Sequence, residues 1–160
     1  MRLTVCAVGK LRAGPETTLI NDYAGRIAAS GRSVGYSGFA IKEVEAPRGL
    51  EGLPRQERES DLLLAAAPDG GRRIALDERG KNLTSTAFAK MLSQWRDDGV
   101  GDAAFLIGGA DGHADKTRNQ ADFLLSLGKA TWPHALARVM LCEQIYRAIT
   151  ISTGHPYHRA

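Results

Sequence analysis

The chain has 160 residues, of which 43% are hydrophobic and 24% are charged, and its formal net charge is +3. This length suits one domain better than two, and this composition excludes disordered and fibrous proteins. The charge permits an anionic partner such as RNA without requiring one, because the basic residues are spread along the chain.

Apolar patterns divide the chain into alternating strands and helices. Short apolar or β-branched runs predict strands, and apolar residues spaced i, i+3, i+4 predict helices. The strands expected in chain order are 3–8, 34–44, 73–77, 103–107 and one that ends at Leu127. The expected helices are 16–29, 54–67, 85–98 and 135–151. This order predicts a single α/β domain over residues 1–160, with a mostly parallel sheet and helices on both of its faces.

Glycines and capping residues set the expected ends of these elements. Gly31 is expected to stop the first helix, and Thr84 or Ser85 to cap the start of the third. Residues 46–52 are expected to form a mobile loop. Trp95 completes the apolar stripe of the third helix, which favours a place in the core over a binding platform.

The N-terminus and the cysteines indicate a cytoplasmic protein. No apolar run approaches the ~20 residues that span a bilayer, and residues 1–4 lack the apolar core of a signal peptide. Cys6 lies in a strand-like run and Cys142 in a helical one, positions that favour free thiols. We therefore expect no membrane partner.

Backbone-rich loops follow three of the expected strands. The strand ends at Leu76, Gly108 and Leu127 are expected to converge, because ligands of such sheets bind at the carboxyl ends of the strands. Residues 108–112, GGADG, stop an apolar run abruptly, as a buried strand ends where its backbone approaches a ligand closely. All the histidines lie beyond residue 112, at His113, His134, His155 and His158. This grouping also favours a functional site in the last third of the chain.

Several reaction classes lack their motif. The dinucleotide fingerprint, the phosphate loop and the serine-hydrolase elbow are all missing from the sequence. His155 and His158 have a metal-like spacing, but no cysteine or carboxylate cluster nearby completes a tetrahedral set, so no metal is expected. Asp111, Asp115 and Glu143 are candidate acids or bases, although a turn suits Asp111 better and a helix cap suits Asp115 better.

Four spaced motifs occur together in this part of the chain. They are LIGGADG at 106–112, WPH at 132–134 followed by Arg138 and Val139, EQIYRA at 143–148, and HPYHR at 155–159. Together they resemble the ribosomal RNA large subunit methyltransferase H family of the SPOUT superfamily. The similarity covers essentially the whole chain, including the strand from Val5 to Gly9 and the strand end Leu76-Asp77.

The resemblance implies an enzyme that uses S-adenosyl-L-methionine to methylate N3 of a pseudouridine in a stem-loop of 23S rRNA. It also implies a homodimer, and a fold whose C-terminal part threads through a loop into a deep trefoil knot. The cofactor-binding residues carried over are Leu76, Gly108, Leu127, Gly128, Lys129, Ala130, Thr131 and Trp132. Two alternatives stay open: a catalytically inactive ribosome-binding module of the same fold, and a small-molecule enzyme unrelated to RNA.

The same resemblance suggests roles for the remaining polar groups. His158 or His134 would take the proton and Tyr157 would stack on or hydrogen-bond the base, with an interfacial structural role as the alternative for His134. The expected substrate-binding residues are Arg138, His155 and Arg159, with helix bracing as the alternative for Arg138. We expect Gly108→Val to occupy cofactor space, and the tail 155–160 to serve the RNA rather than the fold, reaching the partner subunit's cofactor.

Overall fold

The computed structural model of the chain describes residues 1–45 and 48–158, so Ala46 and Pro47 of the expected mobile loop lie outside it. The strands are β1 Arg2–Val8, β2 Gly38–Val44, β3 Arg72–Asn82, β4 Asp102–Ile107 and β5 Phe123–Ser126. They form one sheet in the order β2-β1-β4-β3-β5, and each neighbouring pair is parallel. The α/β fold with a parallel sheet is therefore confirmed.

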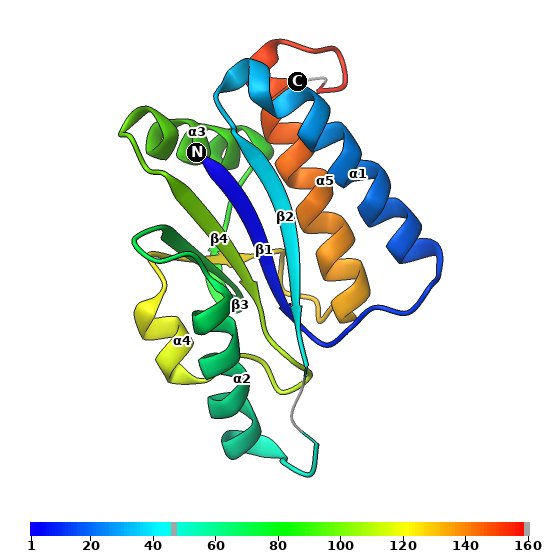
Figure 1. Cartoon of the computed structure of the whole chain (residues 1–160), viewed down its shortest axis with the longest axis vertical. Coiled ribbons are helices and arrows are strands. Elements are labelled where there is room, and N and C mark those ends of the chain that lie inside the picture. Colours follow the sequence, from blue (N-terminus) through cyan, green and yellow to red (C-terminus); the bar gives the residue numbers. More distant parts are fainter. Residues whose placement is uncertain (46–47, 159–160) are drawn as a thin grey trace.

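Helices cover both faces of this sheet (Figure 1). On one face lie α1 Pro15–Gly31, α3 Ser85–Asp97 and α5 His134–Thr153. On the other face lie α2 Gly52–Ala66 and the short α4 Asp115–Gln120. In the part of the chain that the structure describes, no helix is both long and apolar enough to cross a membrane.

The strand β1 divides its side chains between two cores. Because successive side chains of a strand point to opposite faces, Leu3 and Val5 pack beneath α1, α3 and α5, whereas Cys6 packs against Leu63 of α2. The neighbouring strand β4 alternates in the same way, with Phe105 in the first core. Both central strands are therefore apolar along their length, as expected of a parallel sheet covered on two sides.

The helix α1 ends at Gly31 as predicted, but without a left-handed stop there, and the predicted cap of α4 was wrong. Gly31 has helical dihedrals, with φ of −65°, and the chain continues into a 3-10 helix, η1 Arg32–Val34. The left-handed residue that stops this run is Gly35, with φ of 83°. Asp115 does not cap α4, because Ala114 takes that position and Asp115 is the first helical residue.

The predicted cap of α3 is confirmed. Thr84 is the N-cap, and its Oγ1 accepts a hydrogen bond from the backbone N–H of Ala87 at 3.1 Å. Trp95, further along α3, packs partly buried against the core beneath α1, α3 and α5, as expected.

The strand β3 runs five residues beyond its predicted end at Asp77 and shifts register on the way. Leu76 and Lys81 both pair with Leu125 of β5, so residues 77–80 bulge between two stretches that contact the same strand. At this crossing, a Cβ added to Gly80 would lie 2.6 Å from the backbone of Leu124. The chain therefore passes β5 so closely that only glycine fits at position 80.

Candidate functional site

The structure brings the three backbone-rich loops together at the carboxyl edge of the sheet. Leu76 of β3 pairs with Leu125 of β5, and its neighbour Ala75 pairs with Leu106 of β4. Leu76 and the segments that begin at Gly108 and Leu127 therefore lie near one another. The predicted convergence is correct in position, but Leu76 lies inside β3 and is not a strand end.

The glycine loop after β4, residues 108–113, is a tight turn. The N–H of Gly112 donates to the carbonyl of Gly109 at 3.0 Å, and Gly112 has φ of 77°. His113 folds back into the interior, with Nε2 at 3.2 Å from the carbonyl of Leu106. A Cβ on Gly108 would lie 3.1 Å from Nδ1 of His113, so Gly108→Val would displace this loop directly rather than only fill ligand space as expected.

His113 is 3% exposed, and its surroundings keep it neutral. Burial lowers the pKa of His113, and the bond to a backbone carbonyl opposes this only in part. Among the described residues, Nδ1 has no hydrogen-bond partner. The imidazole therefore fills space beneath the loop as an uncharged group.

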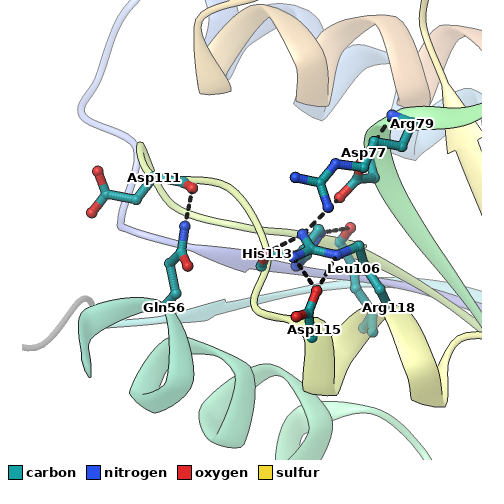
Figure 2. Close-up of polar contacts among 8 residues, drawn as sticks. All are labelled: Gln56, Asp77, Arg79, Leu106, Asp111, His113, Asp115 and Arg118. Atoms are coloured by element: carbon teal, nitrogen blue, oxygen red, sulfur yellow. Dashed lines mark hydrogen bonds and ion pairs between the residues drawn. The ribbon is translucent and has the colours of Figure 1, made fainter. Parts of the chain in front are cut away.

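A single arginine ties the glycine loop to β3 and α4 (Figure 2). Arg118 of α4 contacts Asp77 at 3.2 Å and Asp115 at 2.7 Å, and it donates to the carbonyl of His113. Asp77 in turn accepts from the N–H of Arg79 at 2.9 Å, which shapes the bulge of β3. This network of fixed contacts holds two of the three loops in one arrangement.

The loop after β5 is built from local contacts and leaves its tip open. The hydroxyl of Ser126 accepts from the N–H of Gly128 at 3.1 Å, and Gly128 has φ of 111°, a value that favours glycine. Residues 129–133 are exposed, including Trp132 at 43%. An exposed loop that begins with a glycine suits a flat ligand read by amide and carbonyl groups.

His134 and Arg138 stand at the start of α5. Burial, followed by the charge of Arg138, lowers the pKa of His134, so the half-buried imidazole is neutral near pH 7. Arg138 is 2% exposed and donates to the carbonyls of Val8 and Gly9 at 2.6 and 2.7 Å, and to Glu43 at 2.7 Å. In this structure Arg138 braces the helix and is not placed to meet RNA, contrary to the expected substrate contact.

The tail is docked on its own α5. The hydroxyl of Tyr157 donates to Glu143 at 3.1 Å, its ring meets Tyr146 edge-on at 4.8 Å, and Arg147 lies 4.9 Å from its ring centroid. Burial raises the pKa of Tyr157, so the phenol stays protonated and acts as a donor. The expectation that the tail does not serve the fold is therefore wrong for Tyr157. His155 is exposed, and Arg159 lies outside the described residues.

Comparisons with known proteins bear on this site. A family model described as "Predicted SPOUT methyltransferase" matches residues 1–158. The chain is 51% identical over 160 residues to the ribosomal RNA large subunit methyltransferase H of Rhodopseudomonas palustris strain HaA2, covering 100% of both proteins. It is 50% identical over 159 residues to the protein of that name from Paramagnetospirillum magneticum, covering 99% of both. The chain belongs to the ribosomal RNA large subunit methyltransferase H family.

Solved structures add little to this family assignment. The SpoU methyltransferase AviRb from Streptomyces viridochromogenes, in complex with AdoMet, is 12% identical with a TM-score of 0.39, covering 96% of this chain and 61% of that one. A probable methylase family protein from Haemophilus influenzae is 9% identical with a TM-score of 0.49, covering 99% and 70%. Similarity this distant carries no argument about the ligand.

Arg147 is a residue near the tail that the sequence patterns did not identify as a site candidate. Arg147 holds Glu143 at 2.5 Å and covers the Tyr157 ring, and the i, i+4 spacing of the pair was a signal that could have found it. Glu143 also lines a cavity of about 460 Å³ that extends to Leu127 and is bounded by Met140. The cavity therefore lies between α5 and the loop after β5, and it includes Glu143, the residue that accepts the hydrogen bond from Tyr157.

Within the described ranges, neither the cysteines nor a set of metal ligands contributes to the candidate site. Burial raises the pKa of Cys6 to about 11 and that of Cys142 to about 12, so both are inert free thiols. Among residues 1–45 and 48–158, no group of three or more His, Cys, Asp or Glu side chains is placed to hold a metal ion.

Proposed function

We propose that this chain is an S-adenosylmethionine-dependent enzyme that methylates N3 of a pseudouridine in a stem-loop of 23S rRNA. One observation carries the proposal: Leu76 lies beside the loops that begin at Gly108 and Leu127, in a chain about 50% identical, over its full length, to methyltransferases of the large-subunit RNA. We also propose that residues 1–160 act as one domain in the cytoplasm, where the RNA is found.

The residues present fit the cofactor. An adenine ring held by backbone groups needs loops without bulky side chains, and Gly108, Gly109 and Gly128 meet that need. Leu76, Gly108 and residues 127–132 would hold the cofactor, which supplies an electrophilic methyl group when bound. The exposure of residues 129–133 in the loop after β5 is the observation that supports this fit.

Different side chains of the chain would remove the proton, contact the base and bind the RNA. The imide nitrogen must lose a proton, and His134, neutral because burial lowers its pKa, is able to accept one. His158 is the second candidate. Tyr157 is protonated, so it suits stacking or hydrogen-bond donation to the base rather than proton removal. His155 and Arg159 are the proposed RNA contacts of the tail.

We also propose that the chain is knotted. The observation in favour is that residues 72–82 contact β5 twice, on either side of the bulge, with Gly80 pressed against Leu124. Such a close crossing of two backbone segments is what a chain threaded through a loop requires.

A homodimer with shared sites is the assembly we propose. Leu19 of α1 and Leu136 of α5 are 45% and 39% exposed, which leaves apolar surface for a partner to cover. The hydroxyl of Tyr157 rests on Glu143, which lies about 14 Å along the helix from His134 at 1.5 Å per residue. A docked tail is therefore held well away from the candidate base His134 of its own subunit, which supports use of the tail by the partner subunit.

Mass spectrometry of 23S rRNA from cells with and without this gene tests the activity. Loss of one methylated pseudouridine in the deletion strain, restored by the wild-type gene, is the expected result. Unchanged RNA, with no binding of adenosylmethionine by calorimetry, would instead indicate an inactive ribosome-binding module.

Mixed dimers test the shared site. We would combine a Gly108→Val protein with one whose chain ends at Tyr157, which keeps the docked phenol but lacks residues 158–160. Each protein alone should be inactive. Regained methylation in the mixture supports a site built from two subunits, whereas dead mixtures would mean that each subunit uses its own tail.

A further inference from the structure

Glu59 of α2 is a buried carboxylate to which the proposed function gives no role. Its residue is 1% exposed, and its Oε1 accepts from Nε of Arg55 at 2.8 Å. Among the described residues, its Oε2 has no hydrogen-bond partner. Burying a carboxylate with one unsatisfied oxygen is costly, so a group kept in this state needs an explanation beyond packing.

The carboxylate lies directly behind the glycine loop. A Cβ added to Gly109 would lie 2.6 Å from Oε1 of Glu59 and closer still to Oε2, so the carboxylate is packed directly against the backbone of Gly109. Gln56, one turn earlier on α2, donates to the carbonyl of Asp111 in the same loop. The helix α2 therefore contacts this loop through Gln56 and places the Glu59 carboxylate against the backbone of Gly109.

The charge of Glu59 is only partly offset by Arg55, which pairs with it at 2.8 Å. The Arg55 side chain is 29% exposed against 2% for Glu59, so water screens the arginine more strongly than the carboxylate. Arg138 is occupied by Glu43 at 2.7 Å, and burial lowers the pKa of His134, which keeps it neutral. Asp111, exposed on the loop itself, adds a charge of the same sign.

We propose that Glu59 makes the cofactor site selective for a cationic ligand, so that the site prefers S-adenosylmethionine to its neutral product S-adenosylhomocysteine. This rests on the proposed function, because it takes the glycine loop as part of the cofactor site. Glu59 is a positioning and specificity residue that acts through the loop backbone without touching the ligand. Its charge favours the sulfonium across a medium of low dielectric, and discrimination of product from cofactor limits product inhibition.

The test is calorimetry with both ligands on three full-length proteins: wild type, Glu59→Gln and Glu57→Gln. The Glu59→Gln change keeps the shape of the side chain and removes its charge. Glu57 lies on the same helix and is exposed, so Glu57→Gln is the matched control. We expect the ratio of the two dissociation constants to shift by about tenfold against adenosylmethionine in Glu59→Gln, and to stay unchanged in Glu57→Gln.

Two outcomes would overturn the inference: an unchanged ratio in folded Glu59→Gln, or an equal loss of affinity for both ligands, which would indicate a structural role only. Should Glu59→Gln fail to fold, Arg55→Gln gives a second measurement. Removing that offsetting charge should raise the preference for adenosylmethionine, and an unchanged preference would count against the idea. A wild type that binds neither ligand would sink the proposed function as well, so the two failures are distinguishable.

Discussion

Replacing Arg138 by methionine should destabilise the fold by about 3 kcal/mol. Methionine keeps most of the packing but removes the donors to the carbonyls of Val8 and Gly9, at 2.6 and 2.7 Å. A buried acceptor left without a partner, such as the Val8 carbonyl, costs roughly 1–3 kcal/mol, and the partly buried Gly9 carbonyl costs less. Glu43, whose side chain is 30% exposed, regains water and adds little. The two orphaned carbonyls therefore set the magnitude.

Urea unfolding followed by circular dichroism measures this change. Arg2→Met is the matched control, because Arg2 pairs with Asp102 at 2.6 Å but its side chain is 56% exposed, so that loss should stay below about 1 kcal/mol. A contrary result is easily recognised. If Arg138→Met unfolded at the wild-type urea concentration and had lost only its affinity for 23S rRNA, Arg138 would be an RNA contact and the bracing argument would be wrong.

Three further predictions concern the crossing, the tail and the glycine loop. Gly80→Ala should lower stability by about 3 kcal/mol or more in thermal unfolding, because its Cβ would meet backbone at 2.6 Å, whereas Gly101→Ala, with open space around it, should not. Tyr157→Phe removes the hydrogen bond to the Glu143 carboxylate and should cost about 1.5–3 kcal/mol in urea unfolding; wild-type stability would mean that the tail is undocked in solution. Burial lowers the pKa of His113 below its ordinary 6.5, so the unfolded chain binds more protons. The stability this confers is therefore complete above about pH 6.5 and lost as pH falls towards the folded pKa; His113→Leu should flatten that acid slope, and an unaltered slope would exclude His113 as its source.

The alternation of strands and helices was predictable because each element carries its own periodicity. The extension of β3 was not, since Lys81 and Asn82 look like a polar loop until β5 lies beside them. A helix rich in charge is normally read as solvated, so nothing marked Glu59 of α2 as buried. Its environment exists only once the glycine loop after β4 is folded against it.

The site shows the same division between local and distant causes. The glycines at the ends of β4 and β5 predicted the two loops, because a chain that turns sharply there needs residues without bulky side chains. The bracing role of Arg138 depends on acceptors at Val8 and Gly9, about 130 positions away, which no local pattern reveals. The tail was misjudged for a related reason: groups suited to RNA are equally suited to the surface of α5.

Tyr157 therefore faces two partners that exclude one another. While its hydroxyl donates to Glu143 and Arg147 covers its ring, the phenol is not free to stack on a base. Leaving this position forfeits one hydrogen bond to a carboxylate, roughly 1.5–3 kcal/mol, and stacking on a base returns about 1–3 kcal/mol. Because these values are similar, RNA that binds the tail as proposed would be able to shift it between its docked and RNA-bound positions.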